Sequence, residues 1–196
     1  MMLKKKRNKN SLLYTLLEWT RLLLICGVAA ALIMSFIVRK EEVSGDSMNP
    51  TIKNGEYVFI NIIASYTTEI QRFDVVVARN YKNDDLWVKR VIGLPGETIA
   101  YKDDVLYINN KKMEEPFLNK DYIKNIKEQE NVKLFTNDFN SRKLEKDEYL
   151  LMGDNRLHSL DSRSESVGPF KREQIIANGM FVYHPFKDAR FITNGM

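Results

Sequence analysis

The chain has 196 residues, of which 44% are hydrophobic and 29% charged, and this composition excludes a wholly disordered protein. The formal net charge of +4 is unevenly distributed, because residues 1–40 carry eight basic residues and one acid whereas the rest of the chain is slightly acidic. A nucleic-acid-binding domain usually carries its basic residues on its folded body, so we expect no nucleic acid partner. The single cysteine, Cys26, excludes an intramolecular disulfide.

The N-terminal segment predicts a membrane anchor. Residues 22–38 contain no charge and would form a helix of about 25 Å, close to the thickness of the hydrocarbon core of a bilayer. No small-x-small motif follows, which disfavours a cleaved secretory signal, and a buried core helix is the remaining alternative. We predict a basic N-terminus over 1–11, an uncleaved transmembrane helix over 12–38 and a domain over 39–196. The basic start places the N-terminus in the cytoplasm and the domain on the outer face of the cell membrane.

The domain is predicted to be mainly β, with short and mostly antiparallel strands. Turn residues separate stretches that are rich in Val, Ile, Tyr and Phe. These stretches are residues 56–63, 73–80, 86–93, 105–113, 148–153 and 179–186. Asn109 and Asn110 favour a tight hairpin. Residues 119–147 are polar and charged, and we interpret them as a solvated insertion that could hold a short helix or be mobile.

A first candidate for chemistry is "SGDSMNPT", residues 44–51. Serine in such a turn is usually a cap or turn residue. However, Gly45 lets the backbone approach a ligand, and the N–H groups around Ser47 could stabilise an oxyanion. A nucleophilic serine needs a base, and by composition either histidine, His158 or His184, could serve.

A second candidate base is Lys89 in "LWVKRVIGLPGE". In a strand, alternation puts Trp87, Lys89 and Val91 on one face. Burial on that face would lower the lysine pKa from about 10.4 and leave a neutral fraction near neutral pH. A surface lysine in a different register is the alternative.

The third stretch is "MGDNRLHSLDSR", residues 152–163. Asp161 and Arg163 could pair across a loop, and Ser159 could hydrogen-bond a buried amine. A polar turn cluster is the alternative. The acids lack the alternating spacing of a calcium loop, so we predict no metal site.

Together, "SGDSMNPT", "VKRVIGLPGE" and "GDNRLHSLDSR" after one anchor resemble the type I signal peptidases, in particular the short bacterial form with a single anchor. "FDVVV" resembles a further motif of that family, with Phe73 at a position where glycine is usual. The resemblance covers most of residues 40–186. It implies a transmembrane helix followed by a β-rich signal-peptidase-like catalytic domain that removes signal peptides from exported preproteins without metal or organic cofactor.

The resemblance also implies a role for each site residue. Ser47 would be the nucleophile and Lys89 the general base, while Ser159 would orient the lysine amine. Asp161 and Arg163 would hold the site together, and residues 154–156 would shape the loop. Shallow pockets for small residues one and three positions before the cut would be formed by Val43, Met48, Ile52, Trp87 and Val88.

Two points stay open at the level of sequence. Gly45 stands where some members of the family carry a serine that assists the oxyanion hole, so we assign this role to the Ser47 N–H and leave a second donor unassigned. The alternatives to the peptidase are a catalytically inactive, membrane-tethered β-domain that binds a protein partner, and a self-cleaving Ser–Lys repressor. A repressor would carry a DNA-binding domain in place of the anchor.

Overall fold

The computed structural model describes residues 9–63, 67–82 and 84–192. The chain divides into two compact units, Met1–Val38 and Arg39–Met196. The first unit consists of helix α1 (Lys9–Ile37), which therefore begins inside the predicted basic segment. The rest of that segment, residues 1–8, lies outside the described residues.

Helix α1 is apolar over most of its length. Among the described residues, one helical stretch, Leu13–Leu32, is long and apolar enough to cross a membrane, with a mean hydropathy of 1.6. The stretch includes Glu18 and Arg21, so it starts well before the uncharged run that marks it in the sequence. The side chains of this stretch are exposed, as lipid-facing side chains would be.

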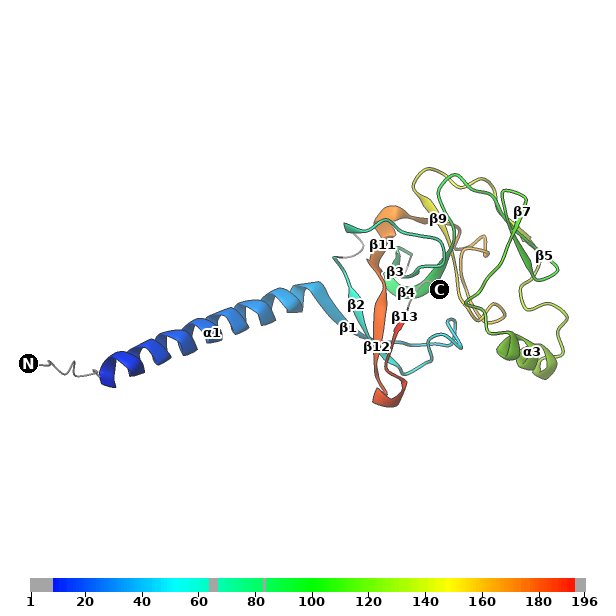
Figure 1. Cartoon of the computed structure of the whole chain (residues 1–196). Helices are drawn as coiled ribbons and strands as arrows, with labels where there is room; N and C mark the ends of the chain where they lie inside the picture. The colour runs from blue at the N-terminus through cyan, green and yellow to red at the C-terminus, as the bar shows by residue number, and fades with distance from the viewer. Residues whose placement is uncertain (1–8, 64–66, 83, 193–196) are drawn as a thin grey trace, which may run out of the picture. The chain divides into compact units, whose positions relative to one another are not determined.

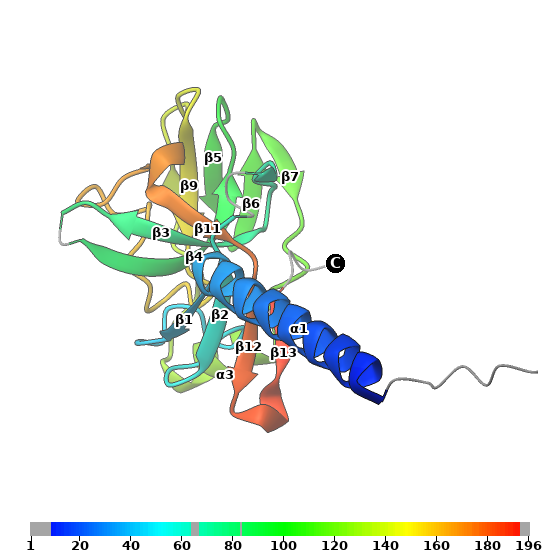
Figure 2. The same ribbon diagram turned by 90° about the vertical axis from the view of Figure 1, so that its left-hand side faces the viewer.

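The second unit is built from three sheets, and every strand pair whose register is described is antiparallel. Figures 1 and 2 show the central sheet between the other two. The first sheet has the order β1 (Val38–Glu42), β2 (Tyr57–Asn61), β12 (Met180–His184), β13 (Arg190–Ile192). The central sheet has the order β10 (Phe170–Lys171), β9 (Glu148–Met152), β4 (Asp85–Gly93), β3 (Val75–Asn80), β11 (Ile175–Asn178). The third has the order β7 (Lys111–Met113), β6 (Val105–Ile108), β5 (Ile99–Lys102), β8 (Phe139–Asn140).

The predicted mainly β architecture is confirmed, and each of the six predicted stretches contains a strand. Asn109 and Asn110 join β6 to β7 with φ angles of 49° and 64°, as a tight hairpin requires. Strands β1 and β5 are two of the described strands that lie outside the predicted stretches, and the others are β8, β10, β11 and β13. The sequences of β1 and β5, VRKEE and IAYK, carry a weak β pattern, and they become strands because neighbouring strands pair with them.

The insertion over residues 119–147 is structured. It contains α3 (Lys120–Gln129), which begins at Asn119, whose side chain accepts a hydrogen bond from the N–H of Tyr122. The Asp104 carboxylate then accepts hydrogen bonds from the N–H groups of Phe135 and Thr136, both at 2.7 Å. Because Phe135 and Thr136 are buried, the expectation of a solvated excursion is wrong for this part of the insertion.

Two buried side chains, Met48 and Ile52, fix the turn between β1 and β2 to the hydrophobic core. Met48 and Ile52 are 1% and 0% exposed and belong to a core cluster with residues of β2, β3 and β12. The Ile52 N–H also donates to the Met48 carbonyl at 3.0 Å. Burial of these two side chains therefore determines where the intervening backbone and the preceding Ser47 lie.

Phe73 has a backbone conformation that favours glycine. It precedes β3 with a φ of 71°, in the left-handed region that costs a residue with a side chain about 1 kcal/mol or more. Its ring packs against Phe117 with the ring centroids 5.0 Å apart. The aromatic contact therefore offsets part of the backbone strain.

We expect Phe73→Gly to be about 1 kcal/mol more stable than Phe73→Ala, because both lose the ring but only alanine keeps the left-handed penalty. Urea denaturation measures the difference. At Val75, inside β3, the order should reverse and the alanine variant should be the more stable one. An alanine variant at position 73 that equals or exceeds the glycine variant would contradict the assignment of strain.

Candidate active site

Ser47 lies in the turn after β1, beside a glycine that the turn requires. Gly45 has a φ of 97°, and its N–H donates to the Asn54 side chain at 2.9 Å. That N–H is therefore already engaged and is not the missing second oxyanion donor. Ser47 is half-buried and lines a pocket, while Met48 next to it is buried in the core.

The structure brings Ser47 and Lys89 together. The Lys89 Nζ lies 2.7 Å from the Ser47 Oγ, although 42 positions separate them in the sequence. Lys89 sits in β4 opposite Val76 of β3, and its exposed fraction is 4%. The amine also lies 5.4 Å from the centre of the Trp87 ring. The lysine is thus held among apolar groups, as the strand alternation predicts.

Burial changes the chemistry of the lysine. It lowers the pKa of Lys89 from 10.5 to about 8, while the Asp161 carboxylate opposes this shift and the Arg163 guanidinium adds to it. A useful neutral fraction therefore exists at mildly alkaline pH. A neutral amine within hydrogen-bond distance of a hydroxyl can accept its proton.

The loop after β9 contacts the backbone on both sides of the Ser47 side chain. The Asn155 N–H donates to the Ser47 carbonyl at 3.0 Å, and the Asn155 side-chain amide donates to the Asp46 carbonyl at 3.1 Å. Gly153 fits between these segments because it has no side chain. A Cβ there would lie 2.3 Å from the Ser47 carbonyl oxygen and 2.3 Å from the Ser159 Oγ.

Gly153 is a site residue that the sequence did not single out. The signal for it was present, since a glycine directly after an apolar strand often marks close backbone approach. The second residue missed is Arg90. Two adjacent cations, Lys89 and Arg90, in an otherwise apolar strand indicate that one of them needs a buried carboxylate.

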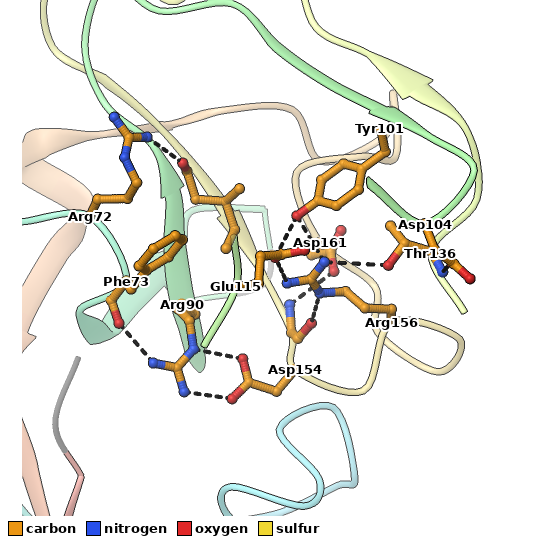
Figure 3. A network of polar contacts seen from close by, with 12 residues as sticks. Arg72, Phe73, Arg90, Tyr101, Asp104, Glu115, Thr136, Asp154, Arg156 and Asp161 are labelled. Atoms are coloured by element: carbon orange, nitrogen blue, oxygen red, sulfur yellow. Dashed lines mark hydrogen bonds and ion pairs between the residues drawn. The ribbon is translucent and has the colours of Figure 1, made fainter. Parts of the chain in front are cut away.

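That carboxylate is Asp154 (Figure 3). Arg90 binds it through two hydrogen bonds, at 2.8 and 2.6 Å, and both side chains are 1% exposed. Arg90 also donates to the Phe73 carbonyl at 2.8 Å, and the Thr51 hydroxyl donates to Asp154 at 2.5 Å. One buried ion pair therefore joins β4, the segment before β3, the loop after β9 and the turn that follows Ser47.

Arg156 joins the same loop to the third sheet (Figure 3). Its guanidinium is buried and binds Glu115 at 2.5 Å, the Tyr101 hydroxyl at 2.8 Å and the Gly153 carbonyl at 3.0 Å. The expected loop-shaping role of residues 154–156 thus has identifiable contacts.

Asp161 and Arg163 form the pair that the sequence suggests. Arg163 binds the Asp161 carboxylate through Nε at 2.8 Å and Nη2 at 2.9 Å, and the Gly153 N–H donates to it at 3.0 Å. Burial alone would raise the pKa of Asp161, but Arg163 and the Gly153 N–H lower it below its ordinary value. A negative charge therefore lies close to Lys89.

Ser159 is near the dyad without being bonded to it. Its hydroxyl oxygen is buried and makes no hydrogen bond of ordinary geometry with the described residues, but it lies close enough to the Asp161 carboxylate to help lower the pKa of that group. In the structure, the Lys89 amine donates a hydrogen bond to the Ser47 hydroxyl. Orientation of Lys89 by Ser159 therefore stays a prediction.

The dyad lines a cavity of about 390 Å³. Of the predicted wall residues, Val43, Met48, Trp87 and Val88 line it. Ile52 packs in the same core cluster as Val43 and Met48 but does not line the cavity, so its assignment to the wall is wrong. Further apolar wall residues come from three strands: Val58, Ile60, Val77 and Leu86. Among the described residues, no three His, Cys, Asp or Glu side chains are grouped so that they could hold a metal ion.

We expect Lys89→Met to raise the free energy of unfolding by about 2–3 kcal/mol at pH 7. The folded-state pKa of about 8 lies below 10.5, so the charged amine destabilises the fold below pH 8, and this penalty disappears as the pH rises to 10.5. Denaturation at pH 7 and pH 10.5 measures it. Lys102→Met, at an exposed position of β5, is the control. An equal effect of Lys89→Met at both pH values would contradict the burial argument.

Comparison with known proteins places this site in a family. Residues 16–184 match the family described as "Signal peptidase, peptidase S26". The chain is 43% identical to Signal peptidase I S of Bacillus subtilis (strain 168) over 178 residues, which is 90% of this chain and 93% of that one. It is 41% identical to Signal peptidase I T of the same organism over 188 residues, covering 95% and 92%.

A crystal structure of a signal peptidase I from Enterococcus faecalis V583 is 33% identical, with a TM-score of 0.47, and the match covers 57% of this chain and 97% of that one. The assignment rests on the sequence matches, which extend over nearly the whole chain. The chain belongs to the signal peptidase family, peptidase S26.

Proposed function

We propose that this protein is a membrane-bound serine endopeptidase that removes signal peptides from exported preproteins, with Ser47 as nucleophile and Lys89 as general base. The observation that carries the residue roles is the 2.7 Å contact between the Ser47 Oγ and a buried lysine amine. Membership of the signal peptidase family gives the reaction and the class of substrate.

The substrate binds as an extended strand beside β4. Residues 85–90 of β4 pair with β3 along one edge of the strand. Along the other edge, the described pairing with β9 begins at Arg90, which lies opposite Met152. Backbone groups of residues 86–89 on that edge therefore suit an added strand, a common mode of peptide recognition. The scissile carbonyl then lies at Ser47.

In the first step, neutral Lys89 takes the hydroxyl proton while the Ser47 Oγ attacks the scissile carbonyl. The Ser47 N–H stabilises the oxyanion. The C–N bond breaks, the lysine gives its proton to the leaving amine, and the signal peptide remains bound to Ser47 as an ester. Lys89 next activates a water, which hydrolyses this ester and releases the signal peptide as a carboxylate. These steps use no metal or organic cofactor.

The supporting residues act through the dyad. Asp161 and Arg163 hold the loop against Ser47 and set the charge around the amine, and the Ser159 hydroxyl orients that amine when it is neutral. The apolar wall at Val43, Met48, Trp87 and Val88 accepts small residues one and three positions before the cut.

The lipid bilayer is the second partner. The charge of residues 1–40 supports a cytoplasmic N-terminus and a catalytic domain on the outer face of the cell membrane. The anchor confines the enzyme to the surface at which exported chains emerge and so raises the effective concentration of substrate. Nucleic acid has no part in this function.

The orientation is testable by labelling single cysteines in a Cys26→Ser background. We expect a membrane-impermeant maleimide to label Lys112→Cys, in the β6–β7 hairpin, on intact spheroplasts, because this residue lies in the domain. Lys5→Cys should be labelled only after lysis. The reverse pattern would overturn the proposed orientation.

We expect Ser47→Ala and Lys89→Ala each to lower kcat/KM for a generic preprotein by at least about 1,000-fold, because the nucleophile and its base act as one unit. Cleavage of purified preprotein, with the product ends sequenced, measures it. Cleavage by either variant at the wild-type rate would show that the dyad assignment is wrong. A wild-type protein that cleaves nothing would favour the inactive binding domain.

The pH dependence separates Lys89 from His158. The acidic limb of kcat/KM reports groups of the free enzyme, so we expect it near pH 8. His158→Gln should leave that limb where it is. A limb that moves with this substitution would assign the base to the histidine.

A further inference from the structure

The loop after β9, residues 153–163, is called the catalytic loop below. Its tip forms one end of the pocket. His158 and Leu160 line the pocket together with Ser47 and Lys89. Residues 153–156 and 161–163 of this loop are held by the buried contacts described above. The tip between them is more exposed, and the His158 side chain is 51% exposed. Something outside the buried network must therefore position this end of the pocket.

The insertion provides that contact. The His158 Nε2 lies 2.5 Å from a carboxylate oxygen of Glu130, the C-cap residue directly after α3. The Glu130 side chain is 34% exposed, so the pair lies at the surface and at the rim of the pocket. A segment 28 positions away in the sequence thus holds the loop that carries Ser159.

The first turn of α3 lies near the turn between β1 and β2, which carries Asp46 and Ser47. Burial raises the pKa of Tyr122, and the carboxylates of Asp46 and Glu130 raise it further, so the phenol lies near both. Figure 1 shows α3 on the same side of the domain as the cyan turn between β1 and β2. The segment from Tyr122 to Glu130 therefore lies near Asp46 as well as against His158.

The helix is fixed firmly enough to serve as a wall. The Tyr122 ring meets Phe135 edge-on with the centroids 6.3 Å apart, and Phe135 is buried. Lys127 pairs with Asp104 at 2.7 Å, and the same carboxylate binds the backbone at Phe135. The contacts with Asp104 tie the insertion at Lys127 and Phe135 to the turn between β5 and β6 of the third sheet.

We propose that α3, held to the catalytic loop by the Glu130–His158 pair, forms the wall that receives the residues directly after the scissile bond, and that it selects small side chains there. This inference rests on the proposed function. The signal side of the substrate lies along β4, which leads from Leu86 towards Lys89. The segment after the cut continues beyond the dyad, where His158 and α3 stand. The His158 ring, held by Glu130, then limits the space for a bulky residue at the second position after the cut.

The test uses the full-length protein in detergent micelles and two series of preproteins. One series carries Ala, Lys, Glu or Trp at the second position after the cut, and the other varies the third position before it. The variants are Glu130→Gln, His158→Gln and the double variant. Glu128→Gln removes the same charge from an exposed position of α3 and is the matched control.

We expect each single variant to lower the preference for Ala over Trp after the cut by about three- to fivefold, the size of change that weakening one hydrogen bond to a carboxylate can produce. The double variant should show no larger a change, because both substitutions weaken the same contact. The preference before the cut should stay within twofold of wild type, as should both preferences of Glu128→Gln. A general loosening of the fold would move both series together.

An unchanged preference after the cut, equal changes in both series, or a change in Glu128→Gln as large as in Glu130→Gln would overturn the proposal. Failure of the proposed function looks different. In that case wild-type protein cleaves none of the preproteins, or the Ser47→Ala variant cleaves them as well as wild type.

Discussion

The buried ion pair between Arg90 and Asp154 is the contact on which the rest of the site depends. Arg90 follows Lys89 in β4, Asp154 follows Gly153 in the catalytic loop, and the Thr51 hydroxyl that binds Asp154 belongs to the turn after Ser47. Breaking a buried pair leaves an uncompensated charge and costs about 3–5 kcal/mol. The three segments are therefore held in one arrangement, and the 2.7 Å contact of the dyad follows from it.

A desolvated lysine is useful for chemistry and unfavourable for stability. Burial among Trp87 and the apolar wall lowers the pKa of Lys89, and this penalises the charged form in the folded state. The charged groups around Lys89 are instead neutralised by hydrogen-bonded ion pairs, as Asp161 is by Arg163. The site thus combines a lysine whose charged form is destabilised by burial with surrounding ion pairs that hold the loops in place, a common arrangement at catalytic centres.

Much of the fold could be predicted from residue patterns. The six apolar stretches and the Asn109–Asn110 hairpin follow from local alternation and turn chemistry, and these signals are properties of short segments. Strand β1 and the packing of the insertion could not be predicted in this way. They depend on partners distant in the sequence, such as the Asp104 carboxylate that binds the backbone of Phe135 and Thr136.

Residue patterns alone predict the apolar N-terminal helix, the β-rich character of the domain and, through the order of three short motifs, the residues expected at the site. What surrounds these residues depends on the tertiary structure. The structure shows that Gly153 must lack a side chain, that Arg90 needs Asp154, and that Ile52 packs in the core without lining the pocket. The physical reason is that burial and close approach are properties of segments brought together from across the chain, and local patterns do not encode them.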